Sequence, residues 1–215
     1  MPHPSRETPP RKKLNRLLDR RNEHPEQLPA IDAQLTESFE RERAIWVLDM
    51  CGFSRLTIRH GIIHYLAMIR RMQRTVLPLI EAGHGRLVKT EADNVFATFA
   101  TVPQALKTAR AVHVALARAN AVLPEDWDVH VGIGIGYGKL LMIGDDDVYG
   151  SEMNLASKLG EDLAEAGDVL LTEAAFAGLK GASRASKRAF SLAHARLVRL
   201  RFAYHRDKRA LVPKP

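Results

Sequence analysis

The stretch Ala44-Ile-Trp-Val-Leu-Asp-Met-Cys-Gly-Phe-Ser54 joins an apolar run to a polar residue and then to a helix start. Residues 44–48 are continuously apolar, which is typical of a buried strand. Ser54 belongs to the residue types that cap helices. Asp49 ends the run, and a carboxylate there is costly unless it is paired or bound to a cation. The stretch therefore predicts a strand, a turn and a helix, with Asp49 as a candidate ligand.

The pattern after this stretch alternates helices with pairs of strands. Over 62–82, apolar residues recur at helical spacing, namely at Ile62, Ile63, Leu66, Ile69, Met72, Val76 and Ile80. The remaining pattern predicts a hairpin over 86–99, a helix over 103–121, a hairpin with strands 128–135 and 139–143, a helix over 150–163, a strand over 169–171, a helix over 173–179 and a basic strand over 190–204. This order predicts an α+β fold with a ferredoxin-like, split βαβ core.

Charge and proline separate the two ends of the 215-residue chain from its middle. The net charge of +7 divides into +3 over residues 1–30, +10 over 180–215 and −6 between them. Six of the eleven prolines lie in residues 1–30, so this stretch is expected to be extended or disordered, with a short helix around 12–21. A lead-in helix is expected over 32–43. We expect an N-terminal extension over 1–40 and one domain over 41–215.

Composition favours a soluble globular protein, with 46% hydrophobic and 27% charged residues. No apolar run approaches the roughly 18 residues of a membrane span, and no signal peptide is expected. Cys51 is the only cysteine, which excludes an internal disulfide framework and favours a reducing, cytoplasmic location. The basic C-terminal segment could bind nucleic acid, but few aromatic residues accompany its charges, so a solvated surface is the simpler interpretation.

A second carboxylate is expected close to Asp49. Asp93 lies in the turn of the 86–99 hairpin, and in a split βαβ sheet this turn and the end of the first strand can be neighbours. Two such carboxylates suit Mg²⁺, which completes its ligand shell with water and phosphate. The amides of residues 50–54 precede and begin a helix, where they could cradle phosphate oxygens. Together these features predict a metal and phosphate site.

Other candidate sites are weaker. The glycines at 132, 134, 136 and 138 do not match the dinucleotide fingerprint, and we interpret them as strand and turn packing. His60 and His64 are four residues apart, but Gly61 stands where a zinc protease needs its glutamate. Cys51 is expected to serve in packing. Arg206 and Lys208 lie in a predicted terminal turn, within possible reach of a triphosphate.

Four motifs in order resemble the class III adenylyl/guanylyl cyclase catalytic domain. Residues 49–54 are similar to D-x-x-G-F-S/T, and 89–93 to K-x-x-G-D. Residues 132–138 are similar to the G-I-x-x-G strand and turn, and 147–158 to D-x-x-G-x-x-V-N-x-A-S-R. The resemblance covers residues 44–179, about two thirds of the chain.

The resemblance implies a role for each matching residue. Asp49 and Asp93 would hold two Mg²⁺ or Mn²⁺ ions, with Gly52, Phe53 and Ser54 at the substrate phosphates. Lys89 and Asp147 would read the adenine edge. Asn154 would orient the ribose, and Lys158 would stabilise the transition state. The family builds each site from two subunits, so a homodimer with shared sites is implied.

Two departures from the family pattern leave alternatives open. Ala92 replaces a glycine before the second metal aspartate, where a positive φ would strain alanine. Lys158 replaces an arginine and loses its bidentate fork. We expect cyclisation of ATP to a 3′,5′-cyclic nucleotide and pyrophosphate. A pyrimidine nucleotide cyclase and a catalytically inactive nucleotide-binding homologue remain the alternatives.

Overall fold

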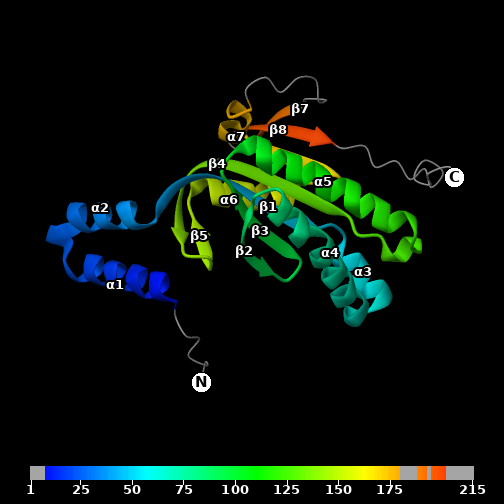
Figure 1. Ribbon diagram of the computed structural model, residues 1–215, viewed down its shortest axis with the longest axis horizontal. Helices are drawn as coiled ribbons and strands as arrows, with labels where there is room; N and C mark the ends of the chain where they lie inside the picture. Colours follow the sequence, from blue (N-terminus) through cyan, green and yellow to red (C-terminus); the bar gives the residue numbers. More distant parts are fainter. Residues whose placement is uncertain (1–7, 180–187, 193–194, 202–215) are drawn as a thin grey trace.

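The computed structural model describes residues 8–179, 188–192 and 195–201 (Figure 1). These residues form an eight-stranded sheet in the order β2-β3-β1-β4-β6-β8-β7, with β5 paired to β4. The β4–β6 pair is parallel, and the other pairs are antiparallel. This arrangement of helices on a mainly antiparallel sheet confirms the predicted α+β class. None of the described helices is long and apolar enough to cross a membrane.

The helices and strands largely occur in the predicted order along the chain. The strands are β1 (Glu40–Met50), β2 (Arg86–Glu91), β3 (Asn94–Phe99), β4 (Val131–Ile143), β5 (Asp147–Tyr149), β6 (Asp168–Thr172), β7 (Arg188–Leu192) and β8 (Ala195–Arg201). The α-helices are α1 (Pro9–Glu23), α2 (Leu28–Phe39), α3 (Phe53–His60), α4 (Ile62–Ala82), α5 (Val102–Ala121), α6 (Ser151–Ser157) and α7 (Glu173–Ala177). Short 3₁₀-helices span Pro25–Gln27 and Glu125–Trp127, and a π-helix, η3, spans Lys158–Leu163.

Strand β1 is buried on both of its faces. Ala44, Trp46 and Leu48 point into the main core with α4 and α5, which Figure 1 shows over one face of the sheet. Ile45 and Val47 point the other way, into a second cluster that includes Ala156 of α6. Alternate side chains thus face opposite layers, which explains why the run is apolar without alternation.

The predicted hairpin within 128–143 is wrong, because β4 is one continuous strand. Its glycines serve the approach of a helix and form no turn. A Cβ on Gly134 would lie 2.1 Å from the carbonyl oxygen of Ala156, and one on Gly160 would lie 2.7 Å from that of Val47. The glycines therefore bring α6 and η3 against β1 and β4, and the strand-packing part of the interpretation is confirmed.

Helix α4 has the predicted bounds but a different buried face at its start. Tyr65 and Met68 are buried there, together with Ile69, Met72, Val76 and Ile80 further along. Three residues of the predicted face are exposed instead: Ile62, Ile63 and Leu66. They leave an apolar surface on α4 that the described residues do not cover.

The N-terminal region is more ordered than its prolines suggested. Residues 8–39 form the helices α1 and α2 with the 3₁₀-turn between them, and the lead-in helix ends at Phe39, where β1 begins. Leu14 and Leu17 of α1 pack with residues of α2 and with Ile143 of β4 in a separate apolar cluster. Figure 1 shows α1 and α2 side by side at one end of the sheet.

The C-terminal strand prediction was also too simple. The predicted strand over 190–204 is a hairpin, β7 with β8, whose second strand pairs with β6. The helix predicted over 150–163 is divided between α6 and η3. The predicted turn at Arg206, Asp207 and Lys208 lies outside the described residues.

Candidate active site

Asp49 lies at the end of β1, paired in register with Gly132 of β4. Its carboxylate is partly buried. Burial is the largest cause that raises the pKa of Asp49, to about 7, and the nearby carboxylates of Asp93 and Glu161 raise it further. A hydrogen bond from the Met50 amide partly lowers it. Desolvation and like charges both disfavour the ionised form. Within the described part of the chain, no positively charged side chain offsets the carboxylate of Asp49.

Asp93 follows Ala92 in the tight turn between β2 and β3. Ala92 has a φ of 51°, so alanine does occupy the left-handed conformation expected of the family's glycine. The hydroxyl of Tyr65 on α4 donates to Oδ2 of Asp93. Burial and this hydrogen bond raise the pKa of Tyr65, so the phenol remains a donor. Tyr65 thus orients the second carboxylate.

Asp49 and Asp93 face the same open pocket of about 880 Å³. Its wall also includes Glu161 and Glu165, from η3 and the segment after it. Among the described residues, no group of three or more His, Cys, Asp or Glu side chains is arranged to hold a metal ion. The two aspartates fit a hard divalent cation that draws its other oxygen ligands from water and a nucleotide.

The predicted phosphate segment begins helix α3 beside this pocket. Gly52 adopts a φ of 93° as the residue before the helix, and it lines the pocket with Met50 and Cys51. Phe53 and Ser54 are the first two helical residues, so their backbone amides belong to the helix N-terminus. Burial raises the pKa of Cys51 to about 11, which agrees with an unreactive packing thiol.

Lys89 and Asp147 form a second pair, on β2 and β5. Lys89 Nζ lies 3.5 Å from Asp147 Oδ1 and 3.1 Å from Glu91 Oε2. Partial burial disfavours the charged forms of both Lys89 and Asp147. For Lys89, the carboxylates of Glu91 and Asp147 outweigh burial and raise the pKa. Hydrogen bonds, chiefly from Tyr149 and Arg11, outweigh burial and lower the pKa of Asp147. The pair therefore presents an ammonium donor beside a carboxylate acceptor.

Asn154 and Lys158 form a third group, at the surface of the protein. They are four residues apart along α6 and the start of η3, and both are exposed. A spacing of four residues places two side chains on the same helix face. Neither residue lines the pocket of Asp49 and Asp93. The structure thus brings the predicted residues together as two preformed pairs and one exposed pair.

Sequence reasoning missed four residues that complete these groups. Tyr65 holds Asp93, and Glu161 raises the pKa of Asp49. Tyr149 and Arg11 both bind Asp147. Tyr149 is two residues from Asp147 on the same strand, so its spacing was a usable signal. Arg11 is 136 residues away, and no local pattern connects it with Asp147.

His60 and His64 form an aromatic cluster with Trp127. The two imidazole centroids are 4.8 Å apart, and the Trp127 ring meets His64 edge-on at 4.9 Å. His64 Nε2 lies 3.1 Å from the backbone carbonyl oxygen of Asp126. The two histidines therefore take part in ring packing and in a contact with the backbone.

Residues 38–202 match the model of the adenylate and guanylate cyclase catalytic domain family. That range is well over half of the chain, which therefore belongs to this family. "Putative adenylate cyclase 3" of Rhizobium meliloti is 32% identical over 138 residues, which are 64% of this chain and 23% of that protein.

A further relative agrees with the family, and a solved structure shares the fold. An adenylate cyclase of Streptomyces coelicolor is 30% identical over 142 residues, 66% of this chain and 35% of that protein. The chain thus spans about a quarter of the length of the first relative and about a third of the length of the second. The adenylate/guanylate cyclase/hydrolase crystal structure from Silicibacter pomeroyi shares the fold, with a TM-score of 0.68 at 24% identity, covering 76% of this chain and 98% of that one.

Proposed function

We propose that this chain is a metal-dependent nucleotidyl cyclase that converts a nucleoside triphosphate, with ATP favoured, into its 3′,5′-cyclic nucleotide and pyrophosphate for signalling. One observation carries the proposal: a family member retains two formed pairs, Asp49 with Asp93 and Lys89 with Asp147. The first pair suits a cation, and the second suits a base edge. Cyclisation requires both functions at the two ends of one nucleotide.

Asp49 and Asp93 would hold two Mg²⁺ or Mn²⁺ ions per site. Bound ions supply a lowered pKa for the ribose 3′-hydroxyl and neutralisation of the phosphate oxygens. Tyr65 orients Asp93 through the hydrogen bond that its hydroxyl donates to Oδ2. The amides that begin α3, at Phe53 and Ser54, would donate to phosphate oxygens at the positive end of the helix dipole.

Lys89 and Asp147 would select the base. Lys89 Nζ can donate to adenine N1, and Asp147 can accept from the 6-amino group. Guanine presents the reverse pattern, which would leave buried polar groups unpaired. Cytosine offers the same acceptor and donor as adenine, so the pair separates adenine and cytosine from guanine and uracil. ATP over CTP is therefore the least constrained part of the proposal.

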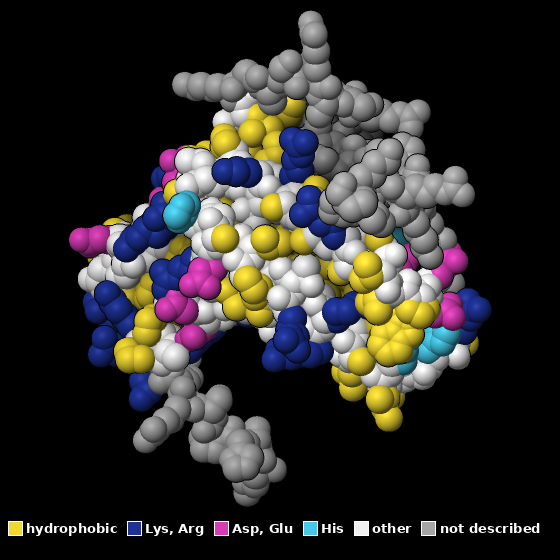
Figure 2. Space-filling model, turned by 45° about the vertical axis from the view of Figure 1, so that its right-hand side comes forward, with side chains coloured by type: hydrophobic (Ala, Val, Ile, Leu, Met, Phe, Trp, Pro, Cys, Tyr) yellow, Lys and Arg dark blue, Asp and Glu magenta, His cyan; other side chains and the backbone are white. Residues whose placement is uncertain are grey.

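The complete site is proposed to form between two copies of the chain. Asn154 and Lys158 are exposed on the surface of α6 and η3, where they can reach the nucleotide of a partner. An apolar surface also lies on α3 and α4, where Ile58 and Ile63 are 86% and 82% exposed. Figure 2 shows hydrophobic side chains gathered at this end of the molecule. A second copy would cover them.

In this homodimer, Asn154 would orient the ribose and Lys158 would stabilise charge at the reacting phosphate. The proposed organisation is an extension over 1–40 and a cyclase domain over 41–215. We place the protein in the cytoplasm, where nucleoside triphosphates and a reduced Cys51 occur together.

The test is incubation with Mn²⁺ or Mg²⁺ and each of the four ribonucleotides, with products resolved by mass. Cyclic AMP is the expected main product. Cyclic CMP as the main product would support the pyrimidine alternative. Nucleotide binding without any cyclic product would support the inactive homologue, which the Lys158 substitution favours because lysine lacks the fork of arginine.

A further inference from the structure

The two oxygens of the Asp147 carboxylate have different surroundings. Oδ2 accepts from Arg11 Nη2 at 3.0 Å and from the Tyr149 hydroxyl at 2.8 Å. Oδ1 accepts from the Val148 amide at 3.0 Å and faces Lys89 Nζ at 3.5 Å. One oxygen is therefore anchored, and the other lies beside the second base-reading group.

Arg11 donates hydrogen bonds to both Asp147 and Tyr149. Its Nη1 donates to the Tyr149 hydroxyl at 2.8 Å while Nη2 donates to Asp147. The three side chains thus form a closed ring of hydrogen bonds. A planar guanidinium can make both contacts at once from a fixed geometry, which a lysine ammonium cannot reproduce.

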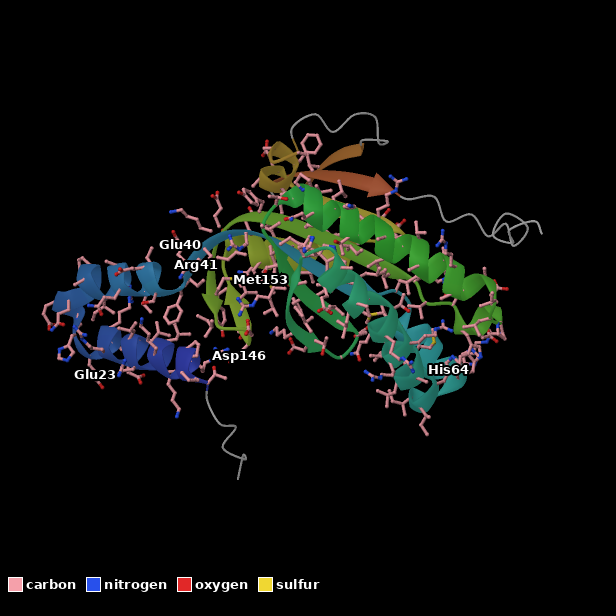
Figure 3. The ribbon with its side chains drawn as sticks, in the orientation of Figure 1. Glu23, Glu40, Arg41, His64, Asp146 and Met153 are labelled. Atoms are coloured by element: carbon pink, nitrogen blue, oxygen red, sulfur yellow. The ribbon has the colours of Figure 1, made fainter. Side chains whose placement is uncertain are left out.

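Helix α1 is held where Arg11 can make these contacts. Its Leu14 and Leu17 are buried against α2 and β4. In its first turn, Pro10 lies against Gly144, and the hydroxyl of Thr8 preceding the helix donates to Asp146. Figure 3 shows Asp146 beside this end of α1. The start of α1 therefore contacts the loop that leads into Asp147 at both Gly144 and Asp146.

We propose that Arg11 is a positioning residue for base recognition: it fixes Oδ2 of Asp147 so that Oδ1 faces Lys89 and the incoming base. This inference rests on the proposed cyclase function and deepens it, because it makes helix α1 of the N-terminal extension part of the base site. Arg11 also contributes to the lowered pKa of Asp147, which keeps the acceptor ionised. Arg11 has no role at the metals or the phosphates.

The consequence is a specific kinetic signature. Without Arg11, Asp147 can rotate away from Lys89, and the amino group of adenine loses a fixed acceptor. We expect Arg11→Ala to raise the KM for ATP about five- to tenfold with kcat within about twofold, since the reacting groups lie elsewhere. Arg11→Lys should fall between Arg11→Ala and wild type. Lys12→Ala is the matched control, because Lys12 is exposed on the same turn of α1.

A double-mutant cycle shows whether Arg11 acts through Asp147. In an Asp147→Asn background, Arg11→Ala should raise the KM less than about twofold further, because the group it positions has been altered. Affinity for tripolyphosphate, which has no base, should be equal in Arg11→Ala and Lys12→Ala. Circular dichroism and thermal unfolding of all variants show whether α1 remains folded.

Binding of 3′-deoxy-ATP, which cannot cyclise, separates this inference from the proposed function. If wild type makes no cyclic product, the cyclase proposal fails, while weaker 3′-deoxy-ATP binding by Arg11→Ala than by Lys12→Ala still supports the role of Arg11. If wild type is active but the two variants have equal KM and affinity, the inference is wrong. Tighter ATP binding by Arg11→Ala would also overturn it, because Arg11 would then compete with the base. No binding of 3′-deoxy-ATP to wild type, together with no cyclic product from any ribonucleotide, would overturn both.

Discussion

The two formed halves of the site differ in how their charges are balanced. At the metal half, Asp49 and Asp93 face one pocket, and the pKa of Asp49 rises to about 7 because the carboxylate is partly buried among other acids. At the base half, Asp147 is surrounded by donors, and its pKa is lowered. The metal half is therefore organised to receive positive charge, whereas the base half is already internally paired.

Their positions in the fold explain this difference. Asp49 ends the central strand β1, which the core buries on both faces, so its geometry follows from the sheet itself. Asp147 begins a short strand attached to β4, and its position depends on side chains from α1 and β2. Changes at the metal half should therefore abolish chemistry, while changes at the base half should alter affinity and selectivity.

The largest expected effect is loss of activity at the metal half. Asp49→Ala and Asp93→Ala should each lower turnover roughly 10³-fold or more, because two-metal chemistry loses an anionic ligand. Turnover with Mn²⁺ at saturating ATP is the measurement, and Glu81→Ala, an exposed acid on α4, is the control. Substantial activity in either variant would mean that a different carboxylate binds the metal.

Complementation between variants tests whether the metal half and the exposed pair, Asn154 with Lys158, come from different chains. Asp49→Ala and Asn154→Ala should each be inactive alone, and their equimolar mixture should regain about a quarter of wild-type activity once subunits exchange. Half of the dimers are then mixed, and each mixed dimer has one intact site. Asp49→Ala mixed with Asp93→Ala should remain inactive. Recovery in neither mixture, with exchange verified, would place the site within one chain.

A smaller gain is expected at the exposed pair. Lys158→Arg should raise kcat about tenfold, because arginine restores a bidentate contact to the reacting phosphate. The KM for ATP should change little, since base recognition lies at Lys89 and Asp147. Equal kcat values for the two proteins would show that Lys158 does not contact the phosphate in the transition state.

Local sequence patterns predicted the fold best where the whole pattern lies within a single helix or strand. Helix α4 was predicted with its observed bounds because one long apolar repeat spans it, and Gly61 and Gly83 flank the helix in the structure. The glycines of β4 wrongly predicted a turn, because close helix packing and a turn both favour glycine. Prolines 9 and 10 suggested disorder, yet they lie at the first positions of α1, where a missing N–H has no cost.

The site was predictable to the extent that short motifs encode it. Asp49 with Asp93, and Lys89 with Asp147, came from spacing and family resemblance, and the structure places each pair together. Arg11 was not predictable, because its contact with Asp147 depends on how α1 packs against β4. Long-range contacts of this kind leave no periodic trace in a sequence.

The pH dependence of stability should reveal the unbalanced metal half. The pKa of Asp49 is about 7 in the folded protein against an ordinary value of 3.8. Between about pH 4 and 7, the folded state binds more protons than the unfolded state, so the metal-free protein loses stability as pH rises. The Tm advantage of Asp49→Asn over wild type should therefore grow across this window. A constant difference would show that the Asp49 carboxylate titrates normally, and saturating Mn²⁺ should reverse the order by stabilising wild type.

The smallest expected effect is at the turn that carries Asp93. Ala92 has a φ of 51°, a left-handed conformation that costs an alanine about 1 kcal/mol relative to glycine. Ala92→Gly should therefore stabilise the protein by about that amount, less the entropy that glycine adds to the unfolded chain. Thermal unfolding should show a Tm raised by about 2 °C. Ala100→Gly is the control, because Ala100 is exposed at the end of the same hairpin without a positive φ, and glycine there should lower the Tm slightly. If Ala92→Gly also lowers the Tm, the turn is not strained, and the departure from the family's glycine has no energetic consequence for the position of Asp93.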